Sequence, residues 1–433
     1  TLGIAAALLL FAGLVALQVW RVPKPQLPPL ATLPDGSTLR LAQVTYGTAH
    51  FAPGAWWHPV ARRLPAAWQQ RLGVTSGPGL STPTPSLGLW FVWDRSGSSV
   101  EWEYALVDAG GSEVSQRPGS SFESSTGTGP KLLGRAFTAF PRRGQMVLLR
   151  IYQHPPGGGR ALLASFHFPN PRPGPYSSWR PQPPPAWSRH GDLEITFQRL
   201  QVGVGEGFPA RPAQVGEESH ACVEFQVKVN DRLDSHWVPD GIEATDATGN
   251  VVIQRSWSGG NKDGHAYLTW SPHLWPSERA WKLRVEFMRN QQAAFDPHEL
   301  IEVKGVAIPA LDEITPVNLL TNRLGSNVRV LGLTSGRGRF PGQQVSASSG
   351  ISLVVEVSPD LKGKRLTLVS AQDNRGRVVE RRGWRRSNNS IGFQLAPAPE
   401  ATSLDFTLAL QEVVTGEFVV QPEAPGPAKA TGE

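Results

Sequence analysis

The residues most suggestive of chemistry are aspartates that recur at equivalent places along the chain. Three of them open the motif Asp-x-x-Gly-x-x-Val, at Asp108, Asp246 and Asp373. Carboxylates are the usual ligands of calcium. Another aspartate ends the apolar strand before each motif, at Asp94, Asp231 and Asp360. A strand of about seven residues, or roughly 23 Å, separates it from the motif aspartate, so the two cannot share an ion. A type I turn, with Asp at its first position and Gly at its fourth, explains the motif instead.

One denser acidic group keeps a calcium site open as an alternative, formed by Asp231, Asp234, Asp240 and Asp246. The other motifs of catalysis are missing from the sequence. The histidines form no His-Glu-x-x-His or His-x-His pair, and there is no Gly-x-Ser-x-Gly elbow or complete phosphate-binding loop. The single cysteine, Cys222, lies in an apolar run and is expected to be a buried small hydrophobe. We therefore expect no cofactor and no catalytic residues, with a hydrolase acting at loop ends as the alternative.

Two clusters of tryptophan and arginine are candidate contact surfaces. The first cluster lies in residues 51–72. Apolar residues recur there at four-residue steps, as on one face of an amphipathic helix, and Pro65 interrupts the pattern. It is suited to a lipid headgroup layer or a membrane partner, although the segment could instead cover an open end of its domain. Its candidate contact residues are Trp56, Trp57, Arg62, Arg63, Trp68 and Arg71.

The second cluster, in the run "RGRVVERRGWRRSNN", is a candidate patch for an anionic ligand. Ordinary solvent-facing arginines are the alternative. The tryptophan occurs eleven residues after its motif aspartate, as Trp257 does in the preceding unit, which favours a structural role for it. The residues of the patch are Arg377, Arg381, Arg382, Trp384, Arg385 and Arg386.

The chain begins with an apolar stretch from Leu2 to Trp20, with Gln18 as its only strongly polar residue. Nineteen helical residues span about 28 Å, close to the hydrocarbon core of a bilayer. We expect a retained membrane anchor, with a cleaved signal peptide as the alternative. A formal net charge of +6 is mild for 433 residues, so a nucleic-acid partner is not expected.

The elements that follow repeat in the same order. Each unit opens with apolar residues two, then three, apart, followed by a glycine; the three-residue step predicts a bulge. A strongly apolar strand, the aspartate turn and a late alternating strand come next. Each unit is expected to close with a short strand and a proline, written "SFHFP", "KGVAIP" and "EFVVQP". This order and spacing resemble immunoglobulin-like or fibronectin-like modules, which implies antiparallel β-sandwiches.

The sequence therefore predicts an all-β protein: an N-terminal transmembrane helix and three tandem sandwiches that fold independently, the first with a partly helical insert. We expect a non-catalytic binding, scaffold or accessory subunit with its body outside the cytoplasm, bound to the bilayer and to a protein partner, with recognition of envelope polysaccharide as the alternative. The expected bounds are an anchor at 1–21, a proline-rich spacer at 22–32, domains at 33–170 (insert 50–85), 188–310 and 318–422, a linker at 171–187, and a flexible tail at 423–433.

Overall fold

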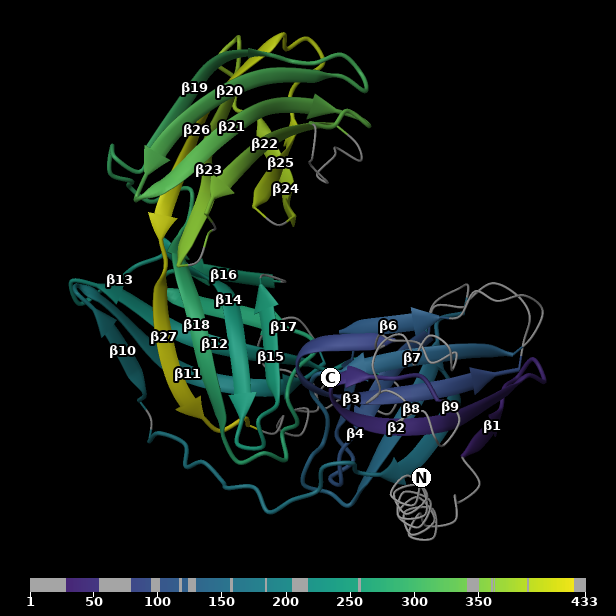
Figure 1. The fold of residues 1–433 in the computed structure, drawn as a ribbon. Coiled ribbons are helices and arrows are strands. Elements are labelled where there is room, and N and C mark those ends of the chain that lie inside the picture. Colours follow the sequence, from purple (N-terminus) through teal and green to yellow (C-terminus); the bar gives the residue numbers. More distant parts are fainter. Residues whose placement is uncertain are drawn as a thin grey trace, which may run out of the picture.

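Every named secondary-structure element in the described part of the chain is a β-strand (Figure 1). All strand pairings between its named strands are antiparallel, so the expected all-β class is confirmed. No helix within this part is long and apolar enough to cross a membrane. The expected anchor at residues 2–20 and most of the expected insert, residues 54–78, lie outside the described residues. The computed structural model describes residues 29–53, 79–94, 102–116, 119–123, 130–155, 159–183, 185–204, 217–255, 258–340, 350–359, 361, 363–387 and 389–423.

The first pair of sheets is here called the first sandwich. Buried and exposed residues alternate along its strands, and the buried residues of the two sheets pack against each other. Phe91 of one sheet contacts Phe166 of the other, with ring centroids 5.6 Å apart. The first sheet has the order β1 (Leu30–Thr32), β2 (Thr38–His50), β3 (Leu80–Trp93), β7 (Lys131–Phe137), β6 (Ser120–Glu123). The second has the order β5 (Glu113–Gln116), β4 (Trp102–Val107), β8 (Met146–Gln153), β9 (Ala161–Pro169).

The second sandwich repeats this arrangement, with Phe225 against Phe287 across its core at 5.3 Å between ring centroids. One sheet has the order β10 (Trp187–His190), β11 (Leu193–Gly203), β12 (His220–Val229), β17 (His265–Trp270), β16 (Ser258–Lys262), with β13 (Arg232–Leu233) also on β12. The other has the order β15 (Val251–Arg255), β14 (Trp237–Asp246), β18 (Trp281–Arg289), β27 (Val414–Val420).

The third sandwich has sheets of unequal width around a core of its own. The narrow sheet has three strands in the order β19 (Leu300–Ala307), β26 (Ser403–Glu412), β23 (Lys364–Asp373). The wide sheet has five strands in the order β20 (Ile314–Arg323), β21 (Ser326–Ser335), β22 (Ile351–Ser358), β25 (Ser390–Ala396), β24 (Glu380–Ser387).

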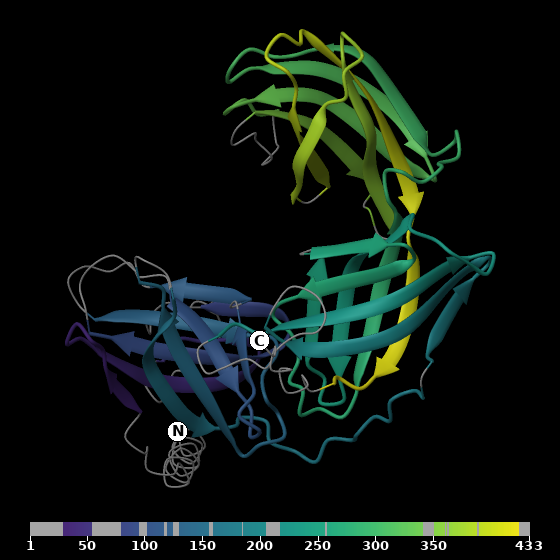
Figure 2. The same ribbon diagram turned by 180° about the vertical axis from the view of Figure 1, so that it is seen from behind.

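The last described strand, β27, does not belong to the third sandwich. β27 pairs with β18 from Trp281↔Val420 to Phe287↔Val414, and it continues β26 after Val413 alone (Figures 1 and 2). β19 pairs with β26 of the third sandwich. The expectation that "KGVAIP" closes the second unit and "EFVVQP" the third is therefore wrong, as is the placement of these strands within 188–310 and 318–422. The third sandwich is inserted between two neighbouring strands of the second.

The local features expected from the repeat are confirmed. The three-residue step is a register shift in each opening strand: between Leu41 and Gln43 in β2, between Phe197 and Arg199 in β11, and between Val330 and Gly332 in β21. Each register shift is a β-bulge, in which one strand of an antiparallel pair has one extra residue.

The three aspartate motifs form the expected turns. In each, the N–H of the glycine donates to the carbonyl of the aspartate, at 2.8 to 3.1 Å. The glycine φ angles are 83°, 86° and 74° at Gly111, Gly249 and Gly376. Each carboxylate accepts at least one backbone N–H bond; Asp246 Oδ1, for example, accepts from Thr248 and Asn250. The motif valines are buried, so the same turn directs each hairpin back onto its core.

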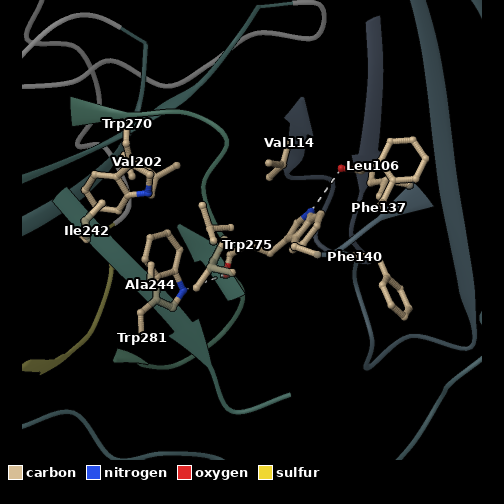
Figure 3. Close-up of a cluster of buried hydrophobic side chains, with 14 of the residues drawn as sticks. Leu106, Val114, Phe137, Phe140, Val202, Ile242, Ala244, Trp270, Trp275 and Trp281 are labelled. Atoms are coloured by element: carbon tan, nitrogen blue, oxygen red, sulfur yellow. Dashed lines mark hydrogen bonds between the residues drawn. The ribbon is translucent and has the colours of Figure 1, made fainter. Parts of the chain in front are cut away.

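The first two sandwiches share one hydrophobic core. Trp275 lies between them, and its Nε1 donates to the carbonyl of Leu106 at 3.3 Å (Figure 3). Asn250 and the backbone of Phe140 exchange two hydrogen bonds across the same junction, at 3.1 and 2.9 Å. Burying one tryptophan of roughly 200 Å² contributes at most about 5 kcal/mol. We therefore expect these two sandwiches to unfold together and not as independent modules.

Candidate functional site

A cleft of about 400 Å³ lies between the second and third sandwiches. Both sandwiches contribute to its walls, and the described residues from each are drawn from several strands. From the second sandwich these are Val238, Pro239, Asp240, Gly259, Met288, Asn290, Gln291 and Gln292. From the third they are Leu361, Arg365, Leu366, Thr367, Arg381, Trp384, Ile391 and Phe393.

The wall from the third sandwich exists because its two sheets differ in width. In the wide sheet, Arg381 pairs with Leu395 and Trp384 with Phe393, and cross-strand partners point to the same face. Leu395 and Phe393 belong to the core, so Arg381 and Trp384 lie on the core side of their sheet. A facing sheet of three strands does not cover all five strands. Trp384 on the outermost strand, β24, therefore stays 42% exposed and faces the cleft.

The opposite wall comes from the ends of β14 and β18 and from the turn that follows β18. Met288 supplies apolar surface, while Asn290, Gln291 and Gln292 supply side-chain amides that donate and accept hydrogen bonds. In Figures 1 and 2 the hairpin of β24 and β25 points from the third sandwich toward the second. The cleft thus combines an aromatic ring, a cation and amides over an apolar base, which is the usual composition of a binding site.

A buried ion cluster holds the two walls together. Arg365 at the start of β23 donates from Nε to Asp240 of β14 and from Nη2 to Glu286 of β18. Arg365 and Asp240 are 8% and 7% exposed. Removing one partner of such a buried cluster leaves a charge without compensation, which is far more costly than losing an exposed pair. The cluster therefore fixes the position of the third sandwich on the second.

The chain passes between the second and third sandwiches twice beside the cleft, after β18 and after β26, and both passages are held by hydrogen bonds. The side chain of Gln411, fully buried at the end of β26, accepts from Arg289 N and donates to Arg289 O, both at 2.8 Å. Arg289 also pairs with Glu299, where the chain enters the third sandwich. The side-chain amide of Gln411 thus ties the end of β26 to the end of β18, where the chain leaves the second sandwich. This restricts the motion that would open the cleft.

The residues of the predicted arginine patch are placed in different surroundings. Arg381 and Trp384 line the cleft, and Arg382 is exposed. Arg377 instead pairs with Asp373 at 2.7 Å and with Glu400, beside the repeated turn. The side chains of Arg385 and Arg386, and all of Trp56, Trp57, Arg62, Arg63, Trp68 and Arg71, lie outside the described residues.

The four aspartates considered as a calcium site each have a different partner. Asp234 contacts His236, Asp240 pairs with Arg365, and Asp246 serves its turn, while Asp231 is an exposed side chain near Arg189. Within the described ranges no group of three or more acidic, histidine or cysteine side chains could hold a metal ion. Cys222 is buried, 3.3 Å from the hydroxyl of Thr269.

Two serine–histidine contacts could suggest nucleophilic chemistry. His50 Nε2 lies 2.8 Å from Ser86 Oγ, and His273 Nε2 lies 2.7 Å from Ser219 Oγ. All four residues are at most 8% exposed. Burial lowers the pKa of both rings, that of His273 to about 4. These pairs act as internal hydrogen bonds, because a substrate cannot reach a sealed hydroxyl.

Comparisons with known proteins add little to this geometry. No family model and no curated protein matches the chain. A solved structure, that of a tetra-tandem repeat in the extending region of a large adhesion protein, is 11% identical and covers 78% of this chain and 70% of its own, with a TM-score of 0.14. A likeness at that score carries no argument about function.

Proposed function

We propose that this chain is a non-catalytic binding protein that takes its ligand in the cleft between the second and third sandwiches. The observation that carries the proposal is the pair Arg381 and Trp384, presented on the uncovered core side of the wide sheet and facing the amides of the second sandwich. The buried cluster of Arg365 holds the two walls in place. Preorganised walls of this kind lower the entropic cost of binding.

The rest of the proposal concerns place and architecture. Leu2–Trp20 is retained as a membrane anchor, and the three sandwiches project on the outer side of the bilayer as an adhesion, scaffold or accessory subunit. The shared core of the first two sandwiches supports a stiff stem, which would hold the cleft at a defined distance from the membrane. N-terminal sequencing of the membrane-bound protein tests the anchor; a mature start near Val22 contradicts it.

Co-purification from native membranes in mild detergent, followed by mass spectrometry, tests the binding role. The wild-type chain is compared with the double variant R381A/W384A. We expect a stoichiometric partner or a retained glycan with wild type and its loss from the variant. Equal recovery from both proteins would show that the cleft is not the binding site. The double variant W187A/R189A is the matched control, because both residues lie on β10, an edge strand of the second sandwich, and Trp187 is 62% exposed.

A further inference from the structure

The strand that borders the cleft, β24, is the last strand of its sheet. It pairs with β25 on one side, and no described strand pairs with its other side. An edge strand leaves a row of backbone N–H and C=O groups available to another extended chain. Recognition by strand addition uses this feature: backbone hydrogen bonds give affinity, and pockets for alternate side chains give specificity.

The cleft beside this edge has an apolar base with a basic border. Leu366, Ile391 and Phe393 line it from the third sandwich and Met288 from the second. The sequence of β24, "ERRGWRRS", contains four arginines and one glutamate. Within the described residues, Arg381 has neither an ion pair nor a side-chain hydrogen bond, whereas the charge of Arg365 is matched by two carboxylates.

From these features we infer that the cleft binds an extended acidic peptide segment that adds a strand to the free edge of β24. This inference rests on the proposed function and names its ligand class. An apolar side chain of the peptide enters the cleft beside Trp384, and flanking carboxylates pair with Arg381 and Arg382. An apolar base and an open backbone edge suit a peptide better than a polysaccharide, since Trp384 is the single exposed ring among the described lining residues.

The test is selection of a random dodecapeptide library on phage against the immobilised full-length chain. Peptides that bind W187A/R189A but not R381A/W384A are sequenced and then synthesised. We expect an enriched pattern of an apolar residue flanked by acidic ones, with affinity at least about tenfold weaker for R381A/W384A. The variant R381E should shift the selection away from acidic residues. Hydrogen exchange should show new protection of the backbone amides of residues 381–387 when a selected peptide binds.

The outcomes separate this inference from the proposed function. If no peptide distinguishes R381A/W384A from the control, or if the selected peptides are basic, the peptide inference is wrong. Tetragalacturonate serves as an anionic glycan probe in the same binding assay. Cleft-dependent binding of that probe, without peptide binding, would overturn the inference and leave the proposed binding role intact. If neither probe depends on Arg381 and Trp384, both proposals fail.

Discussion

Acidification should weaken the joined body of the first two sandwiches through one histidine, His273. Its ring is 1% exposed, Nδ1 lies 2.6 Å from the carbonyl of Leu274, and Nε2 lies 2.7 Å from the hydroxyl of Ser219, whose Oγ also lies 3.2 Å from the carbonyl of Glu113 in the first sandwich. Burial lowers the pKa of His273 to about 4; the hydrogen bond to Leu274 opposes this shift, and nearby His220 adds to it. The folded protein therefore keeps this ring neutral.

The size and sign of the effect follow from proton linkage. An unfolded histidine titrates near 6.5, so below this pH the unfolded state takes up a proton that the folded state excludes. The neutral ring costs no stability above pH 6.5. The free energy of unfolding then falls as the pH drops, by about 1.4 kcal/mol per pH unit well below 6.5. The loss is about 2 kcal/mol at pH 5 and reaches roughly 3 kcal/mol near pH 4.

Guanidinium unfolding at pH 7.5 and pH 5.0, followed by tryptophan fluorescence, measures this loss. Trp384 is the one tryptophan of residues 299–412, so the signal reports mainly the first two sandwiches. The variant H273Q should be less stable at pH 7.5 but should lose about 2 kcal/mol less on acidification. The exposed His167 provides the control variant H167Q. Burial also lowers the pKa of His50, which leaves some slope in every protein. An unchanged slope in H273Q would refute the reasoning.

Three further changes test the architecture. The variants G249V and G376V each force a β-branched residue into positive φ and should cost about 1–3 kcal/mol. Arg142 of the first sandwich donates to the carbonyl of Thr248 in the Gly249 turn at 3.0 Å, so proteolysis should show the first sandwich weakened only by G249V. Replacing residues 292–410 by a short Gly-Ser linker should leave the cooperative fluorescence transition of the second sandwich in place, because β27 and β18 remain; a lost transition would contradict the insertion. The variant R365M should cost about 3–5 kcal/mol in calorimetry by leaving Asp240 and Glu286 without their cation, and D240N/R365M should recover part of that loss.

Local geometry was predictable because it depends on a few neighbouring residues. The turn at Asp246 and Gly249 needs only a carboxylate for its N–H groups and a glycine for positive φ, and both are visible in four letters of sequence. The bulge in β11 likewise follows from the spacing of three apolar side chains. Neither prediction depends on which strand pairs with the one in question.

The partner of β27 was not predictable in this way. "KGVAIP" and "EFVVQP" have the same alternation, and nothing in either string distinguishes a strand that closes its own sandwich from one that returns to the previous one. The cleft was missed for the same reason: Arg365 meets Asp240 across 125 residues, and no periodicity indicates this pair. The patch prediction did include Arg381 and Trp384, but as members of a surface cluster with Arg377, which lies elsewhere.

The return of β27 also determines how the protein carries mechanical load. A pull on Glu423 relative to the first sandwich is transmitted through the hydrogen bonds between β27 and β18 and then through the shared core. The covalent chain runs through the third sandwich, but the tension does not, because β27 is held directly on β18 and Gln411 ties the end of β26 to Arg289 at the end of β18. The third sandwich, and the cleft beside it, would remain free of strain until β27 detaches.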